Sequence, residues 1–376
     1  MQRRLAMASR FWARLWVLSR AVPRLFVPGR VRPTNIRRIL IAQHLLLGDT
    51  IMLAPLLKRL RLRYPDADIT MLCNPAYVSL FEKKPYGVTV LPYDPRSLAG
   101  HRWLGKQAAF DLALIPADNR WSWMARALRS NWIVAFASDK RSYKDWPIDE
   151  FVSFPSTAEA WGDIATRLCD GESPAGYVPA EWPQPGYASF DEPKIPYCVF
   201  HLGASSPHKL WPPDSWLKLI SWAEDLGLEV ILTSGRGEEA PLTVVDPNKR
   251  RRHYAGTLDL PQFWQLLRRA NFLVCPDTGI AHLARVVGTP TVALFGPGSP
   301  DVSGPGRFWK NSAFVALTVK EIACRDQDLL FERKLNWVRH CWRTPAECGN
   351  PICIQAITFD HARRALAQLG MTPLES

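Results

Sequence analysis

The stretch that decides the fold is Cys275-Pro276-Asp277-Thr278-Gly279-Ile280-Ala281-His282-Leu283-Ala284. It follows an apolar run typical of a buried strand, residues 272–275, and opens a helical pattern over residues 279–287. At such a helix start, backbone N–H groups point outward and the helix dipole favours negative charge. The sequence therefore predicts an anion cradle here. His282, in the first turn, is either a further donor to the anion or a core residue.

The same alternation of short apolar runs and helical patterns extends over most of the chain. Alternation of this kind predicts parallel sheets covered by helices on both faces. Residues 171–196 interrupt it with six prolines and little periodicity, which indicates a linker. We therefore expect two α/β domains, with ligands bound beyond the carboxyl ends of the strands, in the cleft between the domains. The expected strands are residues 38–42, 69–73, 88–91, 112–115, 132–136, 199–202, 230–232, 272–275 and 291–295, and the expected helices are 51–62, 121–128, 158–168, 214–226, 260–269, 279–287 and 360–369.

Three further loops follow predicted strands. In Leu47-Gly48-Asp49, Asp49 is either an ordinary N-cap or a carboxylate on the cleft floor that accepts a proton. Residues 203–213 carry Ser205, Ser206 and Lys209, which suit a phosphate or form a solvated loop. Residues 233–239 end in two glutamates, either ribose ligands or a solvated pair. A G-x-G-x-x-G fingerprint is absent from the sequence.

The charge of this 376-residue chain is concentrated at its start. Residues 1–48 hold ten arginines and no lysine or acid, which leaves only +2 of the total +12 for the rest. This distribution argues against a nucleic-acid surface. The arm is too interrupted by arginine for a signal peptide or a membrane span. The pattern predicts an amphipathic helix that ends near Pro23. Three interpretations are open: the helix lies on an anionic membrane, it packs on its own protein, or the segment is a frayed basic leader. Its apolar side is expected to hold Phe11, Trp12, Leu15, Trp16, Leu18 and Val22, opposite Arg10, Arg14, Arg20 and Arg24.

Two patterns with metal-ligating residues give no metal prediction. Eight cysteines are present and no C-x-x-C pair, so a thiol cluster of Cys324, Cys341, Cys348 and Cys353 is favoured over a metal site. The string Asp66-Ala67-Asp68 is interpreted as a helix-to-strand turn, and Asp326-Gln327-Asp328 as a polar stretch. We expect no metal and no cofactor.

Together these motifs resemble glycosyltransferase family 9, the lipopolysaccharide heptosyltransferases, over most of residues 38–305. The resemblance rests on Leu47-Gly48-Asp49, Arg63-Tyr64-Pro65-Asp66-Ala67, Gly203-Ala204-Ser205 with Lys209-Leu210-Trp211-Pro212, Asp277-Thr278-Gly279 with His282-Leu283-Ala284, and Gly288-Thr289-Pro290-Thr291-Val292-Ala293-Leu294-Phe295-Gly296-Pro297. Leu45-Leu46-Leu47 departs from the polar residues that many members carry there, and the arginine-rich arm is additional to the family core.

The resemblance implies a GT-B fold, two Rossmann-like domains whose parallel sheets face an interdomain cleft. It implies an inverting, metal-independent transfer of heptose from ADP-heptose to a lipopolysaccharide core acceptor, with Asp49 as general base. Two alternatives remain: a family-9 transferase with another donor or a protein or O-chain acceptor, and a non-catalytic nucleotide-binding protein. The implied donor contacts are Ser205, Ser206, Lys209, Glu238, Thr257, Asp277, Thr278, Gly279 and His282, and the expected acceptor contacts are Asn119, Lys140 and Arg141.

We further expect four parts of the chain. Residues 1–34 form the basic arm, residues 35–185 the acceptor-side domain, residues 186–355 the nucleotide-sugar domain and residues 356–376 a helix that packs back on the first domain. The arm predicts a cytoplasmic enzyme held peripherally on the inner membrane through residues 10–22. Sequence does not name the acceptor sugar, the linkage or the oligomeric state.

Overall fold

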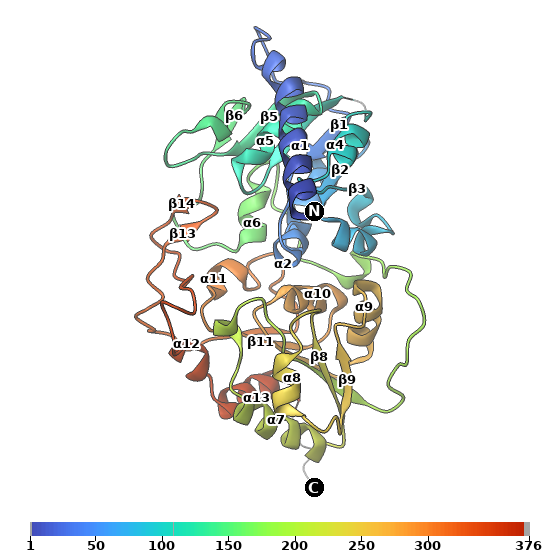
Figure 1. The fold of residues 1–376 in the computed structure, drawn as a ribbon, viewed down its shortest axis with the longest axis vertical. Helices are drawn as coiled ribbons and strands as arrows, with labels where there is room; N and C mark the ends of the chain where they lie inside the picture. Colours follow the sequence, from blue (N-terminus) through green and yellow to red (C-terminus); the bar gives the residue numbers. More distant parts are fainter. Residues whose placement is uncertain (1, 108, 372–376) are drawn as a thin grey trace.

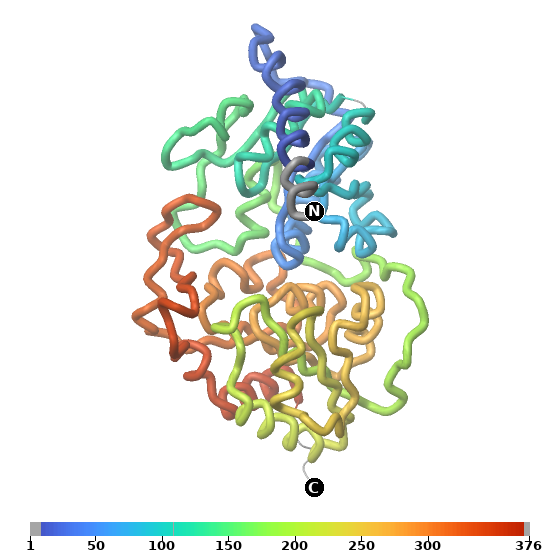
Figure 2. Tube along the Cα trace, in the orientation of Figure 1, coloured from blue at the N-terminus to red at the C-terminus, as the bar shows by residue number. Residues whose placement is uncertain are grey.

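The computed structural model describes residues 2–107 and 109–371, with side chains from residue 9 onward (Figure 2). Two six-stranded parallel sheets stack along the long axis of the molecule (Figure 1). The first has the order β3-β2-β1-β4-β5-β6 and the second β12-β11-β10-β7-β8-β9. The strands of the first are β1 (Arg38–Ile41), β2 (Asp68–Cys73), β3 (Val88–Pro92), β4 (Phe110–Ile115), β5 (Ser130–Phe136) and β6 (Glu150–Val152), and those of the second are β7 (Tyr197–His201), β8 (Glu229–Ser234), β9 (Arg252–Ala255), β10 (Leu273–Pro276), β11 (Thr291–Leu294) and β12 (Phe314–Leu317).

Helices cover both faces of the first sheet. One face carries α1 (Gln2–Leu25), α4 (Leu98–Leu104) and α5 (Ser122–Ala127). The other carries α3 (Ala54–Arg63) and α6 (Trp161–Thr166), which pack on each other. The single helix expected over residues 51–62 is instead two, because a turn at Met52 and Leu53 separates α2 (Leu47–Ile51) from α3.

The second sheet is covered in the same way. On one face lie α9 (Leu260–Arg269) and α10 (Gly279–Val287), and on the other α7 (Pro213–Asp225), α8 (Ala240–Val245) and α13 (Phe359–Gln368). Short helices α11 (Pro300–Ser303) and α12 (Ile352–Gln355) and a hairpin of β13 (Leu329–Leu330) and β14 (Arg333–Lys334) complete the chain, together with the 3-10 turns η1 (Pro75–Phe81), η2 (Pro85–Gly87), η3 (Asn119–Trp121), η4 (Tyr143–Asp145), η5 (Pro179–Glu181) and η6 (Pro207–Lys209).

The prediction that the last helix packs back on the first domain is wrong. Helix α13 packs on α7, β11 and β12 of the second domain, and buries Ala362, Ala365 and Leu366 there. The chain returns to the first domain earlier, through the β13–β14 hairpin, which lies beside α6 (Figure 1). Helical periodicity showed that α13 has an apolar face, but it did not show which domain receives that face.

The linker between the domains is irregular but packed. The Tyr177 hydroxyl donates to the carbonyl oxygen of Val286 at 2.7 Å, in the second domain. The Trp182 indole N–H donates to that of Leu80 at 2.9 Å, in the first. Both rings are buried in one apolar core that extends through both domains. The linker therefore holds the sheets together as well as connecting them.

The arm forms one long helix fixed to the first domain. Ala13 and Ala21 are fully buried against it, and the Trp16 ring lies 5.6 Å from that of His101. The helix continues through Pro23 to Leu25. The helical pattern predicts Trp16 on the apolar side of the helix and Arg20 on the opposite, polar side. Instead both face the protein, since Arg20 donates to the Ala127 carbonyl at 3.2 Å and lies over the Trp16 ring.

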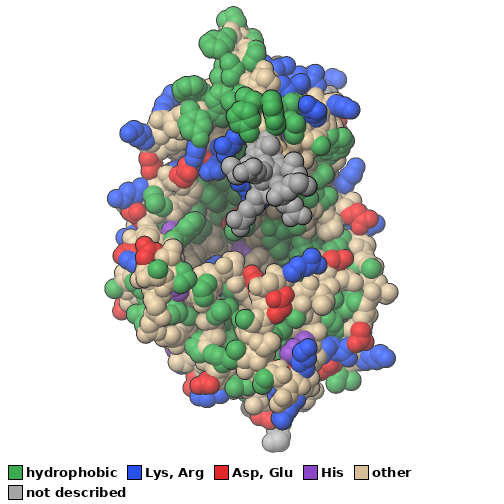
Figure 3. Space-filling model, viewed as in Figure 1, with side chains coloured by type: hydrophobic (Ala, Val, Ile, Leu, Met, Phe, Trp, Pro, Cys, Tyr) green, Lys and Arg blue, Asp and Glu red, His purple; other side chains and the backbone are tan. Residues whose placement is uncertain are grey.

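The opposite side of α1 remains apolar and exposed. Phe11 is 58% and Trp12 55% exposed, and Phe26, just beyond the helix, is 80% exposed. Hydrophobic side chains gather over α1 and the turn that follows it (Figure 3). In the part of the chain that the structure describes, no helix has the length and apolarity needed to cross a membrane. We call the exposed residues the apolar stripe: Phe11, Trp12, Leu15, Leu18, Val22, Phe26, Val27 and Val31.

Candidate active site in the interdomain cleft

The strands of both sheets point their carboxyl ends at a cavity of about 670 Å³ between the domains. The first domain contributes residues 46–49 and 76–77, and the second contributes loops after β7, β8, β9 and β10. Seven of the ten sequence-predicted catalytic and donor residues line it with side chains capable of hydrogen bonding, and an eighth, Gly279, lines it with its backbone. The seven are Asp49, Ser205, Lys209, Glu238, Asp277, Thr278 and His282.

Two glycines bring the facing helices α2 and α10 close together. A Cβ atom added at Gly48 would lie 2.7 Å from Cδ2 of His282, and one added at Gly279 would lie 2.8 Å from Cβ of Leu47. Real Cβ atoms do not approach other atoms so closely, so both positions require the small residue. The amino-terminal ends of two helices from different domains thus meet at one point, beside Asp49.

Asp49 is a carboxylate whose proton is held more tightly than usual. It is half-buried in helix α2, with no hydrogen-bond donor to its carboxylate among the described side chains. Burial, and then the nearby charge of Asp277, raise the pKa of Asp49 to about 6, while Lys209 opposes the shift. A carboxylate with a pKa of this size is largely ionised at neutral pH, yet it is a better proton acceptor than an ordinary aspartate.

Lys209 is fixed to the anion cradle. Its ammonium group donates to the backbone carbonyl of Asp277 at 2.7 Å and lies 3.4 Å from the carboxylate oxygen Oδ2 of the same residue. The 3-10 turn η6, which begins at Pro207, presents the lysine from the β7 loop. Lys209 therefore places a positive charge at the start of α10.

Donors at the start of α10 are left free inside the protein. Thr278 is the N-cap, and its side chain makes no capping hydrogen bond. Its hydroxyl, and Nδ1 of His282, are buried without a hydrogen-bond partner among the described residues. Burial, with the charges of Arg285 and Lys209, holds the pKa of His282 well below its ordinary value, so the ring is neutral. Buried polar groups normally have partners, and these point to a ligand that supplies them.

Comparison with known proteins identifies relatives of this chain. Residues 172–332 match the model of glycosyltransferase family 9 (heptosyltransferase). The chain is 27% identical over 316 residues to lipopolysaccharide heptosyltransferase 2 of Salmonella typhimurium, which covers 71% of this chain and 85% of the relative. The chain is similar to glycosyltransferase family 9. It is therefore a glycosyltransferase.

Solved structures of this family share the fold. A family 9 glycosyl transferase from Veillonella parvula superposes with a TM-score of 0.68 at 16% identity, over 90% of this chain and 98% of that one. The ADP-heptose lipopolysaccharide heptosyltransferase II of Escherichia coli superposes with a TM-score of 0.65 at 18% identity, over 89% and 98%. The predicted GT-B fold is thereby confirmed.

Not every predicted donor residue of the family 9 enzyme reaches the cavity. Ser206 and Thr257 do not line it, and Thr257 is exposed, although its neighbours Gly256 and Leu258 do line it. Of the two glutamates, Glu238 lines the cavity. Glu239 is only partly exposed, does not line the cavity, and accepts a hydrogen bond from the backbone N–H of Gly237 at 2.7 Å. The direction in which a loop side chain points depends on the local backbone, which motif position alone does not reveal.

Several cavity residues were missed by sequence reasoning. Arg236 stands in the quoted loop 233–239 and adds a second cation to the cavity, and Ser234 carries a buried hydroxyl without a described partner. His201 ends β7 and contacts the Thr233 hydroxyl through Nδ1 at 3.0 Å, and burial lowers its pKa to about 4. The signal for all three was available, since each stands at or just after the carboxyl end of a predicted strand.

The three predicted acceptor contacts lie outside the cleft. Asn119 is buried, and its side-chain amide donates to the Phe136 carbonyl at 3.0 Å and to Asp145 Oδ1 at 2.7 Å. Its role is therefore structural. Lys140 lines a small cavity of about 140 Å³ away from Asp49, and the exposed Arg141 guanidinium lies over the Phe151 ring.

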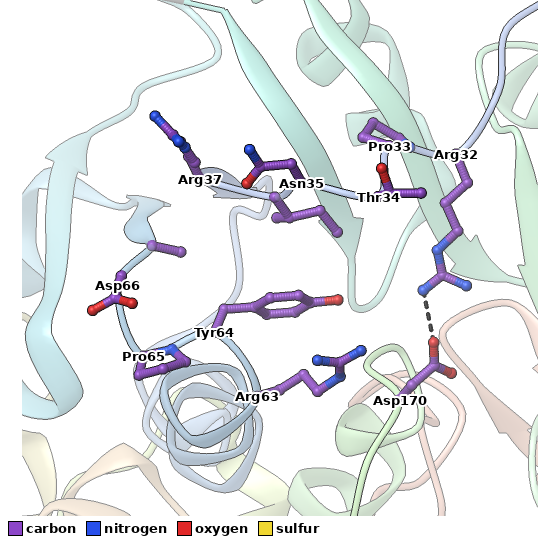
Figure 4. Close-up of a pocket in the computed structure, with 12 residues that line it drawn as sticks. Arg32, Pro33, Thr34, Asn35, Arg37, Arg63, Tyr64, Pro65, Asp66 and Asp170 are labelled. Atoms are coloured by element: carbon purple, nitrogen blue, oxygen red, sulfur yellow. Dashed lines mark hydrogen bonds and ion pairs between the residues drawn. The ribbon is translucent and has the colours of Figure 1, made fainter.

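A larger hollow, of about 820 Å³, lies at the other end of the first sheet, where β1 and β2 begin (Figure 4). It is lined by residues 32–37, before β1, and by residues 63–67, the motif between α3 and β2. Tyr64 lies across it, and Arg32 pairs with Asp170 at 2.8 Å on one side. The family motif Arg63-Tyr64-Pro65-Asp66-Ala67 is thus a helix-to-strand turn, far from the carboxyl ends of the strands.

The C-terminal cysteines gather around one arginine. Three of the four, Cys324, Cys341 and Cys353, lie near Arg325, which donates to the carbonyl oxygens of Phe295 and Gly296. Within the described residues, no three His, Cys, Asp or Glu side chains are arranged to hold a metal ion.

Proposed function

We propose that this glycosyltransferase transfers heptose from ADP-heptose to a saccharide acceptor of the lipopolysaccharide core, with inversion and without a metal ion. Support comes from the relatives, which are lipopolysaccharide heptosyltransferases, one of them named for ADP-heptose. The observation that carries the proposal is the pairing of Asp49, in one domain, with the cradle of Lys209, Thr278 and His282 in the other.

The donor would lie in the second domain. An apolar surface of Leu258, Leu260 and Phe263 suits the adenine ring, and Glu238 suits the ribose hydroxyls. The pyrophosphate would then meet the start of α10, where N–H groups, the Thr278 hydroxyl, and the Lys209 and Arg236 cations converge. The buried Thr278 hydroxyl thereby gains a partner.

The reaction follows from this placement. Asp49 takes the proton of the acceptor hydroxyl as the acceptor oxygen forms its bond to the anomeric carbon. The bond from that carbon to the phosphate oxygen breaks on the opposite face, which inverts the anomeric centre, and ADP leaves with the electron pair. The negative charge that develops on ADP is stabilised by the helix start, by Lys209 and by a hydrogen bond from neutral His282. These groups perform the task that a divalent cation performs in other transferases.

We further propose that the enzyme works in the cytoplasm on the surface of the inner membrane. The apolar stripe is rigidly presented, because the other side of α1 is fixed to α4 and α5. Arg10 and Arg14 are exposed on the same helix, and no acid stands before Asp49. Apolar side chains with flanking arginines match an anionic lipid surface. A lipid-linked acceptor would be met on that surface.

Product analysis tests the proposed transfer. The purified enzyme is incubated with ADP-heptose and with lipopolysaccharide core isolated from a strain that lacks this gene, and the core is examined by mass spectrometry. We expect the core to gain one heptose, in the configuration opposite to that of the donor. Three outcomes would favour one of the alternatives over this proposal. They are transfer from another nucleotide sugar only, transfer to a protein only, and binding of ADP without any transfer.

A further inference from the structure

Between β12 and α12 the chain leaves the second domain, crosses to the first and returns. We call residues 318–351 the strap. Its middle is the β13–β14 hairpin, in which Leu330 pairs with Arg333. Its base is held by a second antiparallel pair, Gln327 with His340. Figure 1 shows the strap along one side of the molecule, spanning the level of the cleft.

One buried arginine anchors the strap to the first domain. Arg333 donates through Nε to the Ala137 carbonyl at 2.7 Å, through Nη1 to the Ala117 carbonyl at 3.0 Å and through Nη2 to Asn119 Oδ1 at 2.9 Å. A buried guanidinium is tolerated only where its N–H groups find such acceptors. Trp337 adds a hydrogen bond to the Pro155 carbonyl at 3.0 Å. The hairpin is therefore a fixed part of the first domain's surface.

The turn of this hairpin is strained. Its two central residues are Phe331, with φ of 46°, and Glu332, with φ of 67°. A two-residue turn with both φ values positive normally contains Asn and Gly, because a side chain crowds the backbone in this conformation. An aromatic residue there is costly, and such strain is concentrated at functional sites. The strained turn is retained in spite of this cost, so the side chain of Phe331 is the feature to explain.

The turn places the Phe331 side chain at the wall of a second cavity. Its ring lies 4.4 Å from that of Trp161 and lines a cavity of about 610 Å³ at the carboxyl ends of the first sheet. The other lining residues all come from the first domain: His44, Leu45, Asn74, Pro75, Asp94, Pro95, Arg96, Ala117, Asp118, Arg120 and Trp121.

This second cavity adjoins the donor cavity at Asp49. Two loops line both: residues 44–45 face the second cavity and residues 46–49 the first, and residues 74–75 face the second and residues 76–77 the first. Trp161, which packs on Phe331, also donates its indole N–H to the Asp49 carbonyl at 3.4 Å. A molecule in the second cavity would therefore lie beside the loop that carries the proposed base.

The chemistry of the second cavity suits a sugar. The rings of Trp121 and Phe331 offer flat apolar surfaces for the C–H face of a saccharide, and Asp94, Asp118, Arg96 and Arg120 offer acceptors and donors for its hydroxyl or acidic groups. Glu332 lies 3.8 Å from Arg120 and so helps to hold it at the rim.

We propose that the strap completes the acceptor site, and that Phe331, carried by the donor-binding domain's own chain, selects the acceptor saccharide by packing against it. This inference rests on the proposed glycosyl transfer and deepens it. Opening of the cleft would be compatible with this role, because the hairpin stays with the first domain through Arg333.

A double substitution tests the inference without endangering the fold. Changing Phe331→Asn together with Glu332→Gly installs the preferred residues for this turn. The relieved backbone strain should offset the lost contact of Phe331 with Trp161 and the lost ion pairs of Glu332 with Arg120 and Lys144. With the core acceptor, we expect the KM for acceptor to rise about tenfold or more, while the KM for ADP-heptose and the affinity for ADP stay unchanged. Leu329→Ala is the matched control, since Leu329 belongs to the same hairpin, is 50% exposed and does not line the cavity.

The outcomes separate this inference from the proposed function. If the wild-type enzyme transfers heptose and the double variant keeps the wild-type KM for acceptor, the strap does not contact the acceptor. A fall in kcat at unchanged acceptor KM would also overturn the inference, because Phe331 would then act through Trp161 on Asp49. If the wild-type enzyme itself transfers no heptose to the core, the proposed function fails first, and ADP affinity alone then reports the donor site.

Discussion

Gly48 and His282 lie so close across the domain interface that one additional carbon atom at residue 48 would be 2.7 Å from the imidazole ring. The contact couples the first domain's catalytic loop to the second domain's anion cradle. It therefore sets the distance between the proposed base and the leaving group, and a small change there should have a large effect.

Gly48→Ala tests this coupling. The added methyl group must displace the buried His282 ring or separate the helices, and overpacking of this kind costs about 1–3 kcal/mol. We expect kcat/KM to fall about tenfold or more, since about 1.4 kcal/mol corresponds to a factor of ten. Gly349→Ala is the control, because a Cβ atom there meets nothing within 4 Å. Equal kcat/KM for both variants would show that the close contact is not needed.

The pH dependence of activity should report Asp49. Its pKa is raised to about 6, and the base must be ionised to accept a proton. We expect kcat/KM to rise with pH and to level off above about pH 6–7. A rate that is flat between pH 5 and pH 8 would contradict the assignment of Asp49 as the base.

The ionisation of Asp49 should lower the stability of the fold as pH rises, whereas it raises activity. Because the pKa of Asp49 is higher in the folded protein than its ordinary value of 3.8, its contribution to stability is fully present below about pH 4 and is lost as pH rises through about 6. Asp49→Asn removes this loss. We therefore expect the Tm of the variant, relative to the wild type, to increase between pH 4 and pH 7.5, as measured by thermal unfolding. A constant difference in Tm would mean that Asp49 ionises normally.

Initial rates should not depend on a divalent metal. Lys209 and the start of α10 stabilise the leaving group in the proposed mechanism. EDTA should therefore leave the initial rate of heptose transfer unchanged. A rate that collapses in EDTA and returns with Mg²⁺ or Mn²⁺ would place a cation at the site.

Membrane binding should depend on the exposed side of α1. The triple variant Phe11→Ser, Trp12→Ser and Leu15→Ser removes apolar area from the stripe and leaves the packed side intact. We expect its affinity for anionic vesicles to fall about 10- to 100-fold, because burying each such side chain is worth up to about 1.5–3 kcal/mol. Activity on a delipidated acceptor should be unchanged. High salt should weaken binding by the wild type without abolishing it.

The matched control changes three exposed apolar residues of the second domain and the strap, Leu217→Ser, Val244→Ser and Trp342→Ser. It should bind vesicles like the wild type, and equal losses in both triple variants would exclude a specific surface. Deleting residues 1–30 is a poor test, because it strips Ala13, Trp16 and Ala21 from α4 and α5 and should destabilise the first domain.

Sequence predicted the parts of the fold that local patterns determine. The central strands, α9 and α10 were found because their apolar runs are continuous or strictly periodic. The missed strands β6, β9 and β12 all lie at sheet edges, where strands are short and partly exposed. Edge strands carry charged residues that hinder further strand pairing, and Arg252 in β9 is an example. Because of such residues, the sequence of an edge strand resembles that of a loop.

The site shows the same division. Asp49, Lys209 and His282 were predicted because they stand at strand ends beside glycine turns. Phe331 could not be found, because its importance depends on a non-local crossing of the strap to the other domain. Asn119 was misassigned because its polar side chain is used by Arg333, more than 200 residues further along the chain.

The most direct test of the account is single-turnover heptose transfer by Asp49→Asn at pH 7.5, with ADP binding measured on the same sample. The amide keeps the size of the carboxylate but accepts no proton, and general base catalysis contributes about 10²–10⁴-fold. We predict a loss of that size in the rate of transfer, with ADP affinity within about twofold of the wild type. A variant that transfers heptose at nearly the wild-type rate would contradict the role of Asp49 and with it the proposed mechanism.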